Sequence, residues 1–219
     1  MLARSVPAML CAALAMFGLA PWFIAQAPYE STMGLVQKIF YFHVPSAIML
    51  FVAAFTAGIA SIGYLRNGKA SSDRLAEAAA ELAVLFGIIV MISGPLWARK
   101  AWGVWWQWDA RLTSTLVLWL LFNAYLLLRR YGGPGSEKLA AGVAIFGMFN
   151  VPFIYWSVNV WRTLHPKTSV VPTLGPEMRF PFYWCMAAFL LLYLALLAAR
   201  VRLAEQEDRL DLLLADAEG

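Results

Sequence analysis

Charged side chains are scarce in this chain. Only 14% of its 219 residues are Asp, Glu, Lys or Arg, and 62% are hydrophobic, whereas soluble domains carry roughly 25% charged and about 45–50% apolar residues. A chain this apolar cannot be a single soluble domain, because it has too few polar residues to cover its surface. The formal net charge of +4 is modest. Basic connectors are expected in membrane proteins as orientation signals, so no nucleic-acid partner is implied.

Cysteine is almost absent. The two thiols, Cys11 and Cys185, each lie inside an apolar run, the first in the inner half of the first span and the second early in the last span. We therefore expect no disulfide between them, and interpret both as buried structural thiols. The sequence has no C-x-x-C pair, which argues against a membrane thiol–disulfide exchanger.

Long apolar runs take the place of charge. Crossing the hydrocarbon core of a bilayer takes roughly 20 apolar residues, with about 17–25 as the usual range, and six stretches free of Asp, Glu, Lys and Arg meet this length. We predict an all-α polytopic membrane protein, with six transmembrane helices in one integral membrane domain over 1–219. The expected spans are approximately 6–26, 39–65, 82–98, 112–128, 139–161 and 180–199.

The distribution of Lys and Arg predicts the orientation. An even number of spans places both termini on one face, and the termini with the even connectors hold ten of the 17 basic residues. This excess favours cytoplasmic termini. Residues 200–219 are predicted to continue the last helix as a cytoplasmic C-terminal tail. The tail could be a solvated helix or a docking helix for a partner, and both interpretations stay open.

The connector between the third and fourth spans is rich in tryptophan. Four of the chain's ten tryptophans fall within seven residues, in the string Trp102-Gly-Val-Trp-Trp-Gln-Trp-Asp109. If this segment is helical, Trp102, Trp105, Trp106 and Asp109 share one face, and the segment becomes an interfacial helix at the outer membrane surface. An ordinary aromatic belt is the alternative. The density of the cluster favours a flat surface on which a large planar ligand stacks.

Histidine is equally rare, and both copies are placed informatively. His43 lies near the start of the second span and His165 in the connector between the fifth and sixth spans. If every span crosses once, the odd connectors share a face, so both histidines and the tryptophan cluster lie on the same side. A single histidine is more often a hydrogen-bonded structural residue than a ligand. Two of them beside an aromatic surface indicate a ligand site.

Haem suits this set of side chains. It is flat and mostly apolar, it binds protein through axial side chains such as neutral imidazole, and its propionates need cations. Lys38 and Arg111 are the predicted propionate partners, while Asp109 is expected to fix Arg111 or to cap the interfacial helix. Zinc fits less well, because the indole surface contributes nothing to tetrahedral coordination.

The tryptophan string, read on to Ala-Arg-Leu-Thr113, resembles the W-G-x-W-W-x-W-D-x-R-L-T signature of the haem exporter protein C family. Two further segments, Phe42-His-Val-Pro-Ser-Ala47 and Thr163-Leu-His165, are similar to that family as well. The resemblance implies His43 and His165 as axial ligands of an exchangeable b-type haem. It also implies haem or chaperone contacts at Trp102, Trp105, Trp106, Trp108, Asp109 and Arg111.

The resemblance further implies a function that is not enzymatic. Members of this family present haem at the outer face of the bacterial inner membrane and deliver it to a membrane-anchored periplasmic haem chaperone during c-type cytochrome biogenesis. The implied partners are that chaperone, an ABC-type ATPase with its membrane subunit, and a small single-span helper protein. Arg162 and Pro166 depart from the family pattern around the second histidine, which affects the expected haem orientation there.

Two other classes of function stay open. A haem-bearing electron-transfer subunit would bury paired histidines between helices and retain its haem, whereas here one histidine lies in a connector. A small-solute transporter is expected to carry charges or broken helices at mid-membrane, and the six predicted spans have no internal Asp, Glu, Lys or Arg. The transporter is therefore the weakest of the three.

Overall fold

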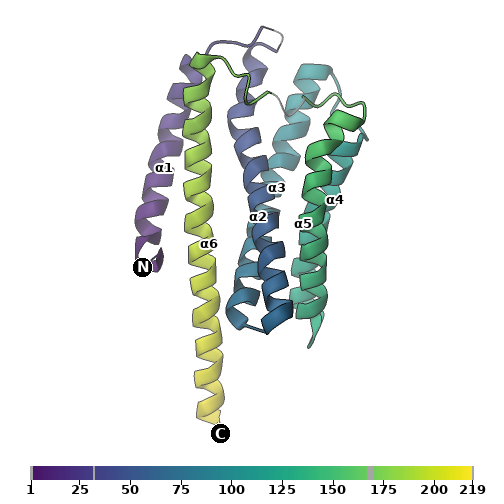
Figure 1. The fold of residues 1–219 in the computed structure, drawn as a ribbon. Coiled ribbons are helices and arrows are strands. Elements are labelled where there is room, and N and C mark those ends of the chain that lie inside the picture. Colours follow the sequence, from purple (N-terminus) through teal and green to yellow (C-terminus); the bar gives the residue numbers. More distant parts are fainter. Residues whose placement is uncertain (1, 32, 167–169, 219) are drawn as a thin grey trace.

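The computed structural model describes residues 2–31, 33–166 and 170–218, which form a bundle of long α-helices (Figure 1). Six of the helices in these residues are long and apolar enough to cross a membrane, which confirms the predicted class. The elements are α1 (Leu2–Gln26), the 3₁₀ helix η1 (Leu35–Ile39), α2 (Phe40–Asn67), α3 (Ala70–Trp102), α4 (Ala110–Tyr131), α5 (Ser136–Val160) and α6 (Pro176–Glu218).

Helices α2 to α5 form one packed group, and α1 pairs with α6 along its side (Figure 1). Small side chains line the contact between α2 and α3, where Ala53, Ala57, Ala79 and Ala83 are fully buried. Small residues let helix backbones approach closely, which is the main source of helix association in membranes. The result is a rigid support for the residues near the ends of α2 and α3.

Two helices extend well beyond the predicted spans. α3 begins at Ala70, before the apolar span that starts near residue 82, and α6 continues unbroken to Glu218, as predicted for the C-terminal tail. Several charges in these extensions form ion pairs: Asp73 and Glu77 contact Arg129 of α4 at 2.8 Å and 3.0 Å, and Arg200 contacts Glu81 at 2.7 Å. The first charged residue therefore marks the end of the apolar run, but the helix itself extends beyond it.

The connectors that precede α2, α4 and α6 lie together at the end of the bundle opposite the two chain termini (Figure 1). This arrangement is the one that the parity of six crossings predicts. The cysteines differ from expectation in part: Cys185 is buried, but Cys11 lies on the exposed side of α1. The reason is that α1 packs mainly against α6 and leaves most of its own surface uncovered.

Candidate functional site

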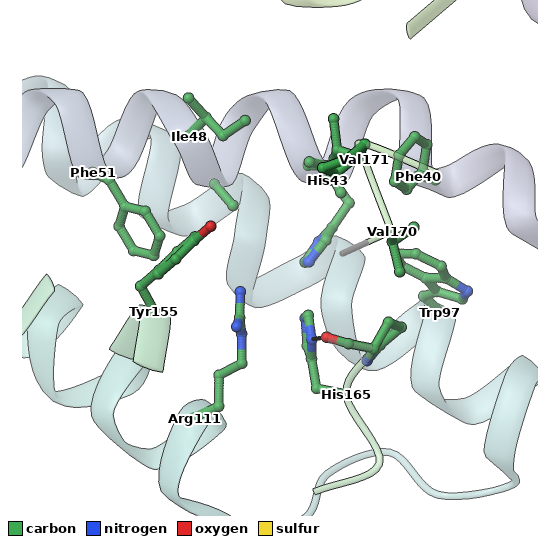
Figure 2. Close-up of a pocket in the computed structure, with 14 residues that line it drawn as sticks. Phe40, His43, Ile48, Phe51, Trp97, Arg111, Tyr155, His165, Val170 and Val171 are labelled. Carbon is green, nitrogen blue, oxygen red and sulfur yellow. Dashed lines mark hydrogen bonds between the residues drawn. The ribbon is translucent and has the colours of Figure 1, made fainter. Parts of the chain in front are cut away.

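A cavity of about 340 Å³ opens at the connector end of the bundle. This volume lies within the range of about 300–1,000 Å³ that small-molecule sites occupy. Its wall is largely apolar and comes from α2, the end of α3, α5 and the α5–α6 connector. Figure 2 shows that His43, Arg111 and His165 point into one shared space from different elements. The apolar part of the lining includes Phe40, Val44, Ala47, Ile48, Phe51, Trp97, Val170 and Val171.

His43 is held from behind by α3. Its Nδ1 lies 2.9 Å from the Ser93 hydroxyl oxygen, and that hydroxyl donates its own proton to the Ile89 carbonyl at 2.6 Å. Because the Ser93 proton is used in the bond to Ile89, Nδ1 of His43 must donate in the hydrogen bond to Ser93. The lone pair of the imidazole is therefore on Nε2. His43 is 7% exposed, so this arrangement is shielded from competing water.

The backbone of α2 and α3 gives the His43 ring its place. Pro45 has no N–H, which disturbs the helical hydrogen bonding of this turn, and the Ser46 hydroxyl donates to the His43 carbonyl at 2.8 Å. On α3, Gly94 faces the ring: a Cβ there would lie 3.3 Å from His43 Cε1. The absence of a side chain at Gly94 therefore lets the imidazole pack close to α3.

His165, in the α5–α6 connector, also has its free lone pair on Nε2. Its Nδ1 lies 2.9 Å from the Pro166 carbonyl oxygen, and because a carbonyl only accepts, Nδ1 carries the proton and Nε2 the lone pair. Burial and, to a smaller extent, the nearby Arg111 lower the pKa of His165 from 6.5 to about 4, against the opposing effect of the hydrogen bond to Pro166. The ring is therefore neutral at pH 7 and available as a ligand.

Arg111 supplies positive charge to the cavity. It lies in the first turn of α4, and its Nη1 atom is buried with no hydrogen-bond partner among the described residues. Asp109, two residues earlier, uses one carboxylate oxygen on Leu112 N–H and the other on the Thr163 hydroxyl. An unpartnered buried guanidinium nitrogen is costly, so a ligand with an anionic edge would relieve it.

The tryptophan-rich segment is not helical, so the interfacial helix considered for it does not form. α3 ends at Trp102, Gly103 takes a left-handed conformation with φ of 77°, and residues 103–109 are not helical. The physical reason is that the segment lies between a signal that ends α3, Gly103, and a signal that begins α4, Asp109. Glycine at this position ends a helix by allowing positive φ, and the Asp109 side chain caps α4 by accepting from Leu112 N–H at 2.8 Å. Asp109 thus caps α4 rather than an interfacial helix.

Three of the four tryptophans of the cluster border one hollow, and Trp108 is not part of its lining. Trp102, Trp105 and Trp106 line a second, smaller hollow of about 60 Å³ on the α3–α4 side of His43. Trp106 contacts Trp108 edge-on at 5.8 Å between ring centroids, and Trp108 is 75% exposed. His43 also lines this hollow, so it stands between the main cavity and the tryptophan cluster.

Lys38 is directed elsewhere. Its ammonium donates to the Ala25 carbonyl at the end of α1, at 3.1 Å, and lies 4.8 Å from the Tyr29 ring centroid. Neither hollow includes it in its lining. The structure thus brings His43, Arg111 and His165 together but does not bring Lys38 to them, and its role as a propionate partner stays a prediction.

Three residues of the site were not anticipated from the sequence. Trp97 contacts His43 edge-on at 5.6 Å and stacks on Trp102 at 6.5 Å, which connects the two hollows. Tyr155 on α5 lines the cavity opposite α2 (Figure 2). Ser93 had a signal, since it is a hydroxyl inside an apolar span, but Tyr155 had none, because it is one of several aromatic residues on α5.

Comparison with known proteins agrees with the sequence motif. The model of the family described as Heme exporter protein C matches residues 1–213. Heme exporter protein C of Bradyrhizobium diazoefficiens is 34% identical over 206 residues, which is 91% of this chain and 78% of the relative. The Escherichia coli K12 protein of the same name is 36% identical over 189 residues, covering 83% and 75%. That of Paracoccus denitrificans is 34% identical over 195 residues, covering 86% and 81%.

Proposed function

The chain belongs to the Heme exporter protein C family, and from this membership we propose that it binds haem at the outer face of the bacterial inner membrane. It then delivers the haem to a membrane-anchored periplasmic haem chaperone during c-type cytochrome biogenesis. It acts as a handling and transport component rather than as an enzyme. Its termini face the cytoplasm, and the cavity with the tryptophan-rich connector faces the periplasm.

One observation carries the proposal: two imidazoles with the same tautomer enter one apolar cavity. His43 and His165 each commit Nδ1 to an oxygen acceptor, which leaves Nε2 free on both rings. Haem iron has two axial positions outside its macrocycle, and imidazole is a common axial ligand. A fixed hydrogen bond on the other ring nitrogen is the usual support for a metal-ligating histidine.

The lining also suits the rest of the ligand. The wall is mostly aliphatic and aromatic, as a porphyrin face requires. Arg111 provides a buried cation with an unpartnered nitrogen, and bidentate pairing with carboxylates is the geometry that a guanidinium favours. We therefore assign Arg111 to a haem propionate and both histidines to the iron. The hollow under Trp102, Trp105 and Trp106 adjoins His43 and extends the aromatic surface toward the chaperone side.

The proposed partners follow from the family. They are an ABC-type ATPase with its membrane subunit, a small single-span helper protein, and the haem chaperone. The exposed indoles of Trp105 and Trp108 lie on the connector that is proposed to meet the chaperone. Tryptophan is enriched among the residues that dominate protein interfaces.

The test is a haem titration of the full-length protein purified in detergent, followed by absorbance. The wild-type protein should give a six-coordinate low-spin spectrum. We expect His43→Ala and His165→Ala each to lose that spectrum. Arg111→Leu should keep the six-coordinate spectrum but bind haem more weakly. Ser157→Ala, which removes a buried hydroxyl that bonds only its own helix at Ile154, is the control.

Unchanged spectra and affinities in both histidine variants would reject the ligand assignment. A second measurement addresses delivery: haem should pass from the loaded protein to a purified chaperone of this system. A loaded protein that keeps its haem in the presence of every such acceptor would instead favour a haem-retaining electron-transfer subunit.

A further inference from the structure

The acidic residue that ends the tryptophan string contacts the connector that carries the second histidine. One oxygen of the Asp109 carboxylate accepts from Leu112 N–H at 2.8 Å and caps α4. The other accepts a hydrogen bond from the Thr163 hydroxyl, 54 residues later in the chain. Asp109 thus joins the start of α4 to the α5–α6 connector.

Thr163 passes this contact on to His165. Its hydroxyl proton is directed at Asp109, and its oxygen accepts the backbone N–H of His165 at 3.0 Å. A hydroxyl oxygen has both a proton to give and lone pairs to accept with, so one side chain serves both contacts. The His165 ring is fixed separately, through Nδ1 to the Pro166 carbonyl. The backbone of the residue is therefore held by Thr163, and the rotation of its ring is held by Pro166.

The contact is well suited to hold a connector in place. A hydrogen bond to an ionised carboxylate is shorter and roughly twice as strong as one between neutral groups. Asp109 is itself anchored, since it begins a long helix whose first turn it caps. The residues from Trp161 to Pro166 follow the end of α5 without helical structure, so they depend on such contacts for a defined position.

From this geometry we propose that Asp109 is a positioning residue for His165, acting through Thr163, and that it does not contact the ligand itself. The proposal rests on the proposed function, in that His165 ligates haem iron. It assigns the acid of the tryptophan motif a role distinct from that of the indoles before it. Thr163 becomes an essential member of the site, although it lines neither of the two hollows that His43 borders.

The test compares Thr163→Val, which keeps the shape of the side chain but loses the hydroxyl, with Thr163→Ser, which keeps the hydroxyl. Thr163 holds the backbone of His165 and not its ring, so its loss should cost about what one hydrogen bond contributes. We expect Thr163→Val to weaken haem binding by about tenfold and to convert part of the spectrum to the five-coordinate form. Thr163→Ser should stay close to the wild type. Should Thr163→Val not yield folded protein, Thr163→Ala removes the same hydroxyl without adding an apolar group.

Asp109 is tested with Asp109→Ser, because serine is also a good helix N-cap but is too short to reach Thr163. It should reproduce the Thr163→Val defect, and the double variant should be no worse than either single one, since both remove the same contact. Added imidazole should restore the six-coordinate spectrum in all three, because an open axial position accepts it. A merely structural defect would not respond to imidazole in this way.

Wild-type affinity and spectrum in Thr163→Val would overturn the proposal, and so would independent, additive losses in the double variant. His43→Ala and His165→Ala are measured in the same series. If these two also leave binding unchanged, the proposed haem site itself fails. If they abolish the six-coordinate spectrum while Thr163→Val does not, only the positioning role of Asp109 fails.

Discussion

Removing the Ser93 hydroxyl should weaken haem binding without altering the fold. In Ser93→Ala the Nδ1–H of His43 loses its acceptor at 2.9 Å, and His43 is buried, so water cannot readily replace it. A buried donor left unsatisfied costs about 1–3 kcal/mol. The affinity loss seen when an outer partner of a metal-ligating histidine is removed is about 10–100-fold, or about 1.4–2.8 kcal/mol at 1.4 kcal/mol per tenfold. The first figure is a cost in folding stability, which the free and the loaded protein share, so the affinity loss is expected in the second range.

The assay is the absorbance titration with haem, made on wild-type protein, Ser93→Ala and Ser93→Thr. Threonine keeps the hydroxyl and should retain most of the affinity. Ser157→Ala is the matched control, because Ser157 also bonds a carbonyl of its own helix at 2.8 Å but has no histidine partner. If Ser93→Ala binds haem as tightly as Ser157→Ala while His43→Ala loses binding, the reasoning that Ser93 sets the state of His43 is refuted.

Two further predictions concern the fold. Gly87→Ala should destabilise the bundle by about 1–3 kcal/mol. The new Cβ would lie 2.3 Å from Trp119 Cδ1 and would displace the indole from its hydrogen bond to the Val84 carbonyl. A thermal melt in detergent that matches the wild type would contradict this. Arg129→Met should lower the melting temperature, since it leaves Asp73 and Glu77 without their shared cation, yet haem affinity should not change because these groups lie at the end of the bundle away from the cavity. A loss of affinity at unchanged stability would show that the two ends are coupled.

Much of the fold could be predicted because the bilayer imposes a simple rule on the sequence. Apolar runs of sufficient length and the parity of crossings gave six helices with the odd connectors at one end, as observed. The start of α3 could not be located from its apolar run alone, whereas the continuation of α6 beyond residue 199 was predicted. Asp73, Glu77 and Glu81 end an apolar run, but on a helix surface they pair with Arg129 and Arg200 and the helix continues.

The site was predictable in composition and less so in arrangement. Parity places His43 and His165 on one side, and the structure brings both to one cavity with Arg111. The shape of the tryptophan segment was missed because helical spacing alone suggested a shared face, whereas Gly103 and Asp109 carry stronger local signals that end one helix and start the next. The contacts of Ser93 with His43 and of Asp109 with Thr163 join residues 50 and 54 apart in sequence, and no local pattern encodes such pairs.

The two imidazoles are held with unequal firmness, and this bears on what the site does. His43 belongs to a helix buried between others, with Ser93 and Gly94 fixing its ring, whereas His165 belongs to a non-helical connector fixed by Thr163 and Pro166. Segments with few buried contacts open at far lower free energy than packed helices. Release of the ligand should therefore begin with displacement of His165 while His43 stays in place. A subunit that retains its haem gains nothing from an axial ligand that is held less firmly than the other. A protein that transfers its haem to an acceptor does benefit from such a ligand, so this asymmetry favours delivery over electron transfer.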